Sequence, residues 1–172
     1  MSFRRHVALI GPMGSGKSTV GRQVADELGM AFVDNDVVLE QRVGTDAASY
    51  AATHGRAALH EVEAALVLEA LHGTEPAVLA TAASIIEDAA CRRALADHAI
   101  TIWLHGDVAD LARRAERGEH RPLADDVADE LARLGRLRDP LYAEAADLAV
   151  DVSANSSAAT VAAILDHLAI ER

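Results

Sequence analysis

The segment GPMGSGKST at residues 11–19 constrains the fold of this chain more than any other stretch of its sequence. It satisfies the pattern G-x-x-x-x-G-K-[ST], follows the apolar run His6–Ile10 and precedes a run with helical character. Gly11, Gly14 and Gly16 allow turns with positive φ, so successive backbone N–H groups can converge on one anion. The N-terminus of the following helix adds positive charge at the same place. An incidental lysine in a glycine-rich turn is the alternative, but motif, strand and helix agree on a phosphate-binding loop.

The same segment predicts a site for a nucleoside triphosphate, with ATP and Mg2+ as the expected cofactors. Lys17 is expected to reach the β- and γ-phosphates, and the hydroxyl of Ser18 is expected to bind the magnesium ion. The nucleotide-binding residues expected in this loop are Gly11, Gly14, Ser15, Gly16, Lys17, Ser18 and Thr19. The motif identifies the phosphate donor and says almost nothing about the acceptor.

Short apolar runs alternate with longer helical patterns, which favours an α/β fold in which helices flank a mostly parallel five-stranded sheet. The predicted strands are His6–Ile10, Ala31–Asp34, Ala77–Thr81, Ala99–Leu104 and Leu148–Val152. The predicted helices are Gly16–Leu28, Val37–Gln41, Ala47–His54, Ala57–Leu71, Glu87–Ala96, Val108–Arg117, Val127–Leu137 and Ala158–Leu168. We expect one domain of the P-loop NTPase or kinase type over residues 1–172, with a polar lid at about 114–126.

Charge and composition exclude several partners. The formal net charge of −11 argues against binding to nucleic acid or an anionic membrane, because both need a basic surface. Cys91 is the only cysteine, so no internal disulfide or paired-cysteine metal site is possible. The sequence shows neither a signal peptide nor an apolar run of membrane-spanning length. We therefore expect a cytoplasmic protein that acts as a monomer on a small molecule.

Two carboxylates, Asp34 and Asp36, lie at the end of the second predicted strand. Ligands of open α/β sheets bind at this edge. One carboxylate could hold magnesium through water, while the other could accept a proton from an attacking hydroxyl. The alternative is a structural role, with Asp36 as the N-cap of the next helix.

Four segments, in this order and spacing, resemble shikimate kinase, a small P-loop protein similar to the nucleoside-monophosphate kinases. They are GPMGSGKST at 11–19, VDNDVVLEQRVG at 33–44, RPL at 121–123 and RDPLY at 138–142. The resemblance covers nearly the whole chain. It implies a five-stranded parallel sheet, ATP with Mg2+, and phosphorylation of a hydroxyl on a small ring acid.

On the acceptor side, the resemblance implies that Asp34 is a carboxylate of the magnesium shell and that Asp36 contacts the substrate hydroxyl. It implies that Arg121 in the lid touches both phosphate and substrate, and that Arg138 holds the substrate carboxylate. Phosphoryl transfer does require positive groups around the moving phosphate and a loop that excludes water. The expected catalytic residues are thus Lys17, Asp36 and Arg121. The alternative for both arginines is a solvated charge near a helix end.

On the nucleotide side, the resemblance implies that Arg114 packs on the adenine. The segment Asp151–Ser157 would flank the other face of the base, and we expect Asn155 within it to contact the nucleotide.

His60 departs from the family pattern G-E-x-x-F-R-x-x-E, because the corresponding stretch 55–63 reads GRAALHEVE. Histidine is mostly neutral at pH 7 and lacks the forked donors with which arginine binds a carboxylate. Losing a hydrogen bond to a charged partner, about 1.5–3 kcal/mol, would weaken substrate binding roughly ten- to a hundredfold. Arg56 could partly replace the missing charge. The alternative is that His60 is an ordinary surface or core histidine.

Ala82, Ala83 and Ser84 stand where the family carries three glycines. Alanine in a left-handed conformation costs about 1–2 kcal/mol, so either the backbone differs here or the pocket is narrower. We expect Ala82 and Ala83 to line the acceptor site with Asp36, His60 and Arg138.

These patterns predict an ATP-dependent phosphotransferase that acts on a hydroxyl of a small acid, with shikimate or a relative as the acceptor. Two alternatives remain open. The protein could phosphorylate another small polyol or sugar acid, or it could bind nucleotide without efficient catalysis.

Overall fold

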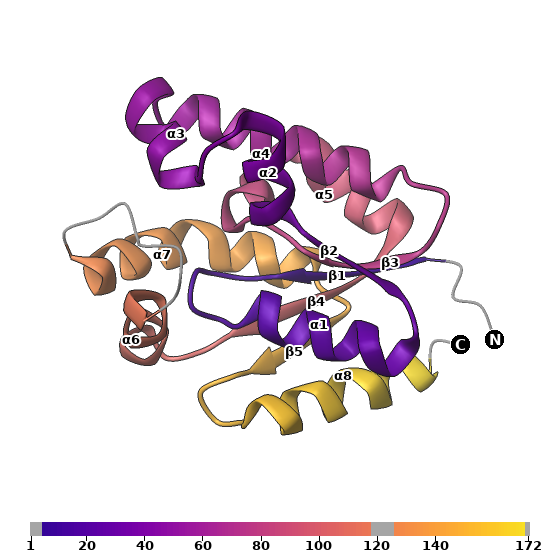
Figure 1. Cartoon of the computed structure of the whole chain (residues 1–172). Coiled ribbons are helices and arrows are strands. Elements are labelled where there is room, and N and C mark those ends of the chain that lie inside the picture. Colours follow the sequence, from indigo (N-terminus) through magenta and orange to yellow (C-terminus); the bar gives the residue numbers. More distant parts are fainter. Residues whose placement is uncertain (1–4, 118–125, 171–172) are drawn as a thin grey trace.

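The computed structural model describes residues 5–117 and 126–170. Five parallel strands form one sheet, as the sequence predicts, and their order in the sheet is β2-β3-β1-β4-β5 (Figure 1). Their bounds are β1 His6–Ile10, β2 Ala31–Asp34, β3 Ala77–Ala80, β4 Ala99–His105 and β5 Leu148–Asp151. β1, the strand before the phosphate loop, lies in the centre and pairs with both β3 and β4.

Helices cover both faces of this sheet. They are α1 Lys17–Leu28, α2 Asn35–Val43, α3 Ala47–His54, α4 Arg56–Leu71, α5 Ala89–His98, α6 Val108–Arg117, α7 Val127–Ala145 and α8 Ser157–Ile170, with a 3-10 helix, η1, at Ala83–Glu87. In Figure 1, α1 and α8 lie below the sheet, and α4 and α5 lie above it. Among the described residues, no helix combines the length and the apolar character that a membrane crossing requires.

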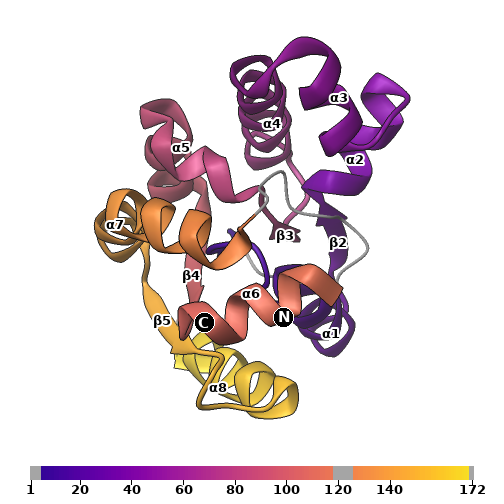
Figure 2. The same ribbon diagram turned by 90° about the vertical axis from the view of Figure 1, so that its left-hand side faces the viewer.

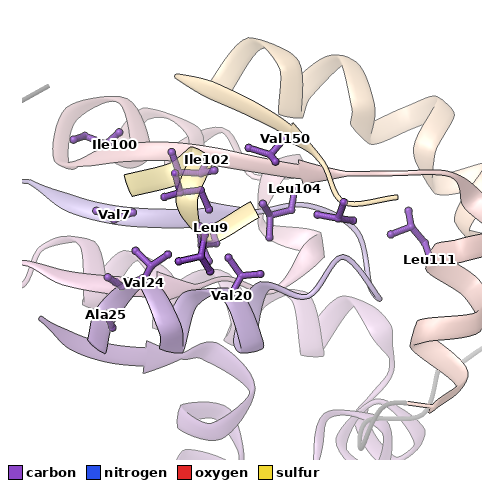
Figure 3. Packing of buried hydrophobic residues seen from close by; sticks show 14 of the residues in the cluster. Val7, Leu9, Val20, Val24, Ala25, Ile100, Ile102, Leu104, Leu111 and Val150 are labelled. Carbon is purple, nitrogen blue, oxygen red and sulfur yellow. The ribbon is translucent and has the colours of Figure 1, made fainter. Parts of the chain in front are cut away.

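The alternation of side chains along β1 builds a separate core on each face. Val7 and Leu9 point to one face, where they pack with α1, α8 and α6 (Figure 3). Ala8 and Ile10 point to the other face and belong to the cluster that includes buried side chains of α4, α5 and α7. All four side chains are fully buried, which explains why this strand is apolar at every position.

A third apolar cluster joins α2, α3 and α4 through Leu39, Ala51, Leu59 and Leu66. This cluster supports the helices that follow β2, and α2 begins directly at the Asp34–Asp36 turn. Asp34 therefore ends β2 and caps α2, and Asp36 lies in the first turn of this packed helix rather than on a free loop.

Three element bounds differ from the sequence prediction in ways that affect the site. α7 does not end at Leu137 but runs through Pro140 to Ala145, because Leu131, Arg138 and Tyr142 form one continuous buried stripe along it. The helix predicted at Glu87–Ala96 begins and ends two residues later, at Ala89–His98, since Glu87 ends η1 and Asp88 caps α5. Asp34 rather than Asp36 is the N-cap of α2, so the structural alternative for Asp36 was wrong.

Candidate active site

The carboxyl ends of β2, β3 and β1 lie next to one another. They bring together the aspartate pair after β2, the small residues after β3 and the phosphate loop after β1. Asp34 on β2 is in register with Ala80 on β3, which is in register with Leu9 on β1. The backbone N–H and the hydroxyl of Thr81 both donate to the carbonyl of Leu9, at 3.2 and 3.0 Å. Figure 2 looks onto this edge, with α2, α3 and α4 at the top, α7 at the left and α6 below.

The loop between β1 and α1 needs glycine at two positions because the chain passes very close to other backbone. A Cβ atom added to Gly11, whose φ is +143°, would lie 2.2 Å from the carbonyl oxygen of Leu104. A Cβ atom on Gly14, at φ +79°, would lie 2.2 Å from the carbonyl oxygen of Leu111. Gly16 adopts φ +88° and is the N-cap of α1. The loop is thus held against β4 and α6 in the conformation that the motif predicts.

Lys17 bends back over this loop. Its Nζ atom donates to the carbonyl oxygens of Gly11 and Pro12, each at 2.9 Å. Burial lowers the pKa of Lys17 to about 8, although the carboxylates of Asp36 and Asp34 oppose that shift. A partly desolvated ammonium group close to the loop is well placed to meet an anion.

Two observations on the loop fit a magnesium–nucleotide complex. The hydroxyl oxygen of Ser15 is fully buried and has no hydrogen-bond partner among the described residues. Ser18 and Thr19 are exposed in the first turn of α1, where backbone N–H groups lack intrahelical acceptors. No group of three or more His, Cys, Asp or Glu side chains within residues 5–117 and 126–170 could hold a metal ion. Binding of magnesium by Ser18 and Asp34 together with the nucleotide phosphates stays a prediction, in keeping with the few protein ligands that this ion takes at nucleotide sites.

Asp34 and Asp36 lie beside Lys17. The Oδ1 atom of Asp34 accepts a hydrogen bond from the backbone N–H of Asp36 at 3.1 Å, which orients the turn. Both aspartates are partly buried, and their negative charges raise the pKa of Lys17 against the effect of burial. The structure thus places the carboxylate predicted for the acceptor hydroxyl next to the lysine predicted for the γ-phosphate.

Arg138 approaches the same space from α7. It is buried, and its positive charge contributes to lowering the pKa of both Lys17 and His60. His60 is half-buried on α4, and burial is the largest cause of its lowered pKa. The imidazole is therefore neutral near pH 7 and supplies no charge for a carboxylate. The Nη1 atom of Arg56 donates to Glu130 at 2.8 Å, and its positive charge also contributes to lowering the pKa of His60, so its partial replacement of the missing charge stays a prediction.

Two glutamates at this site were missed by the sequence analysis. Glu87 at the end of η1 accepts a hydrogen bond from Nε of Arg138 at 2.6 Å. Glu63 on α4 is buried and accepts a hydrogen bond from the hydroxyl of Ser84. Burial raises the pKa of Glu63 to about 7, and the nearby Asp36 adds to this shift. The signal for Glu63 was present, because a glutamate one turn from both Leu59 and Leu66 lies on the apolar face of α4.

The alanines that replace the family's glycines are unstrained. Ala82 is extended, with φ −64° and ψ 146°, and Ala83 begins η1. No residue other than glycine has a positive φ in the described part of the chain. The alanines therefore do not pay the cost of a left-handed conformation, and both possibilities, a different backbone and a narrower pocket, stay predictions. Both residues lie at the site, directly after β3 and Thr81.

The elements predicted to flank the nucleotide base also lie together. Nη2 of Arg114 on α6 donates to the carbonyl oxygen of Val152 at 2.9 Å, which joins α6 to the turn after β5. Within that turn, the exposed Asn155 donates to the carbonyl oxygen of Asp151 at 2.7 Å. Contact of Arg114 and Asn155 with adenine stays a prediction. Arg121 and most of the lid predicted at 114–126 lie outside the described residues.

A parallel sheet of this order, with the phosphate loop after its central strand and an aspartate pair beside it, defines a P-loop kinase of small molecules. A sequence model of the family described as "SKI: Shikimate kinase" matches residues 13–169. The chain therefore belongs to the shikimate kinase family, and as a member it is an ATP- and Mg2+-dependent phosphotransferase.

Curated relatives and solved structures agree with this assignment. The chain is 35% identical over 170 residues to a shikimate kinase of Pseudoalteromonas atlantica, covering 98% of this chain and 99% of the relative. It is 37% identical over 168 residues to that of Methylococcus capsulatus, with coverage of 96% and 93%. The shikimate kinase of Acinetobacter baumannii, solved in complex with shikimate, superposes with a TM-score of 0.91 at 29% identity, covering 98% of this chain and 94% of that one.

Proposed function

We propose that this protein transfers the γ-phosphoryl group of ATP to a hydroxyl of shikimate. The observation that supports this most is the electrostatic coupling of Lys17 to both Asp36 and Arg138, which come from different elements around one small space. The lysine suits the phosphate of the donor, and the aspartate suits the hydroxyl of the acceptor. The buried arginine suits the carboxylate of the acceptor. The solved relative that binds shikimate has 29% identity with this chain, which makes the same acceptor the first candidate.

We assign each residue at the site one role in the reaction. Bound ATP would supply the phosphoryl group, and a magnesium ion held with Ser18 and Asp34 would neutralise part of the negative charge of its phosphates. Asp36 orients the acceptor hydroxyl and takes its proton as the new oxygen–phosphorus bond forms and ADP leaves. Lys17 stabilises the negative charge on the transferred group, and Arg138 holds the acceptor through its carboxylate.

An assay of ADP release tests this proposal. Turnover should saturate with shikimate and fall about 10²- to 10⁴-fold in Asp36→Asn, which keeps the shape of the side chain but cannot take up the proton. Asp166→Asn is the matched control, because Asp166 is exposed on α8, on the other side of the sheet from Asp36. ADP release that stays at background with shikimate and a panel of hydroxy acids, despite nucleotide binding, would contradict the proposal. A fully active Asp36→Asn variant would contradict the role of Asp36.

Other expectations from the sequence belong to this proposal. They are a single domain over residues 1–172, a lid at about 114–126 that carries Arg121, and a monomer in the cytoplasm without a nucleic-acid partner. The acidic composition supports the absence of a nucleic-acid partner, and the single cysteine supports the cytoplasmic location.

A further inference from the structure

The ion pair between Arg138 and Glu87 is unequal in burial. The Arg138 side chain is 9% exposed, whereas the Glu87 side chain is 38% exposed. The distance of 2.6 Å between Nε and Oε1 makes this a short, charge-assisted hydrogen bond. Glu87 therefore occupies one donor of the arginine from the solvent side, while the arginine itself stays fixed in the protein.

The backbone that carries Glu87 is held at several points. Nη1 of Arg92 donates to the carbonyl oxygens of Ile86 and Glu87, at 2.7 and 3.0 Å. At the other end of η1, the hydroxyl of Tyr142 donates to the carbonyl oxygen of Ala83 at 2.8 Å. Tyr142 lies one turn after Arg138, so α7 contacts both ends of the short helix. Only the side chain of Glu87 is free to move when Arg138 takes another partner.

Among the other charged groups around this pair, Arg133 is a further cation, because the negative charge of Glu87 contributes to raising its pKa. His60 is affected by Arg138, Glu87 and Arg56, and its lowered pKa keeps it neutral near pH 7. Asp36 contributes negative charge to the same site, whereas Glu63, whose pKa burial raises to about 7, carries only part of a negative charge at pH 7. Lys17 is required at the phosphates, and Arg133 donates to Glu130 at 2.8 and 3.0 Å. An acceptor carboxylate thus approaches an arginine that already has an anionic partner.

We propose that Glu87 opposes the acceptor carboxylate at Arg138 and so determines how strongly this enzyme selects an anionic acceptor. The inference rests on the proposed function, because it assumes that the acceptor carboxylate binds Arg138. Binding requires the acceptor to displace the Glu87 side chain from Nε or to share the guanidinium with it. Either way, repulsion between the two carboxylates and the loss of the Arg138–Glu87 bond reduce the affinity.

Glu87→Gln tests the inference, because glutamine keeps the size of the side chain and an oxygen for Arg138 but removes the charge. The KM for shikimate should fall about three- to thirtyfold, while kcat and the KM for ATP change less than about twofold. Glu69→Gln is the matched control, because Glu69 is also an exposed glutamate paired with an arginine, Arg42, at 2.9 Å. This control should leave every kinetic constant unchanged.

A neutral acceptor separates charge from shape. The methyl ester of shikimate lacks the carboxylate charge, so its KM should be the same for the wild-type enzyme and Glu87→Gln. An equal fall of KM for the acid and the ester would overturn the inference, because the effect would then not concern the carboxylate. An unchanged or raised KM for shikimate, with the thermal unfolding midpoint preserved, would also overturn it. If Glu87→Gln unfolds, Glu87→Ala is measured with the same expectation.

If the proposed function is wrong, neither protein will phosphorylate shikimate, and the inference is then tested by binding alone. If neither the wild-type enzyme nor Glu87→Gln turns over shikimate, calorimetric titration of shikimate into each protein with bound ADP decides the inference. Tighter binding by Glu87→Gln supports it even though the proposed reaction fails. Equal binding by the two proteins, or no binding by either, overturns it.

Discussion

Glu63 is a buried acid on α4 that accepts a hydrogen bond from the hydroxyl of Ser84. Positive charge from Arg138 and Lys17 lowers the pKa of Glu63, but burial has the larger effect and raises it to about 7. The unfolded chain would ionise this group near 4.5, so the folded protein keeps a proton that the unfolded protein loses. Glu63 should therefore make the free energy of unfolding depend on pH.

We expect Glu63→Gln to be more stable than the wild-type protein at pH 8. Below about pH 4.5 both states of the wild-type protein carry the proton, and burial of Glu63 costs nothing through ionisation. As pH rises from about 4.5 to about 7, the free energy of unfolding falls, because the unfolded state has released a proton that the folded state still keeps; above about 7 this effect levels off. The gap between variant and wild type should widen by about 2–3 kcal/mol between pH 5 and pH 8. Urea unfolding at both values measures it, and Glu69→Gln is the control. Parallel pH profiles for Glu63→Gln and the wild type would contradict this expectation.

At the scale of single residues, the sequence predicted the position of a residue correctly where a motif or a strand end marks it. Gly11, Gly14 and Lys17 are constrained by the phosphate loop, and Asp34 and Asp36 follow from the place where a strand ends. Glu87 could not be found this way. Its role depends on the side chain of Arg138, 51 positions later in the chain, and no local pattern marks such a pair.

At the scale of elements, η1 shows how the chain replaces glycines without strain. Ala82 and Ala83 have ordinary dihedral angles, and their neighbour Ser84 donates to Glu63. Ala82, Ala83 and Ser84 therefore fill the segment between β3 and α5 with side chains in ordinary backbone conformations. That they narrow the acceptor pocket stays a prediction.

We expect Ala82→Gly with Ala83→Gly to destabilise the protein by about 1–2 kcal/mol. Each glycine increases the freedom of the unfolded chain and removes a methyl group that is at least partly buried. Gly44→Ala provides the comparison, because Gly44 adopts φ +78° with open space where a Cβ atom would lie, and alanine there should cost about 1–2 kcal/mol. Urea midpoints measure both. If the double glycine variant were more stable than the wild type, the alanines would be strained after all.

The ends of helices and strands could be predicted where turn residues and caps mark them. The prediction was wrong where packing against other elements decides how far a helix continues. α1 ends at Leu28 as predicted and begins one residue later than predicted, and the glycines that cap it, Gly16 and Gly29, both have positive φ. Proline favours a helix end, yet α7 continues past Pro140 because Arg138 and Tyr142 are buried against η1 on the side opposite the exposed proline. Propensity gives a local preference, and a buried stripe along a helix can outweigh it.

At the scale of the whole molecule, the phosphate loop is joined to the most buried part of the sheet. β1 is the central strand, it pairs on both sides, and it has almost no exposed surface. α1, which starts at the loop, contributes Val20, Val24 and Ala25 to the large core on one face. The loop cannot lose its structure locally without disturbing that core. Nucleotide binding should consequently stabilise the whole fold rather than one segment.

We expect ADP with Mg2+ at about a hundred times its dissociation constant to add about 2.7 kcal/mol to the free energy of unfolding. For a chain of this length, that corresponds to a rise of about 5–10 °C in the thermal unfolding midpoint. Lys17→Ala should lose most of this rise, because the lysine provides the ammonium group beside the loop carbonyls. Asp166→Asn on α8 should keep it in full. Calorimetric scans with and without nucleotide measure both variants. A biphasic transition in which nucleotide shifts only one phase would show that the loop and the sheet unfold separately, contrary to the coupling through β1.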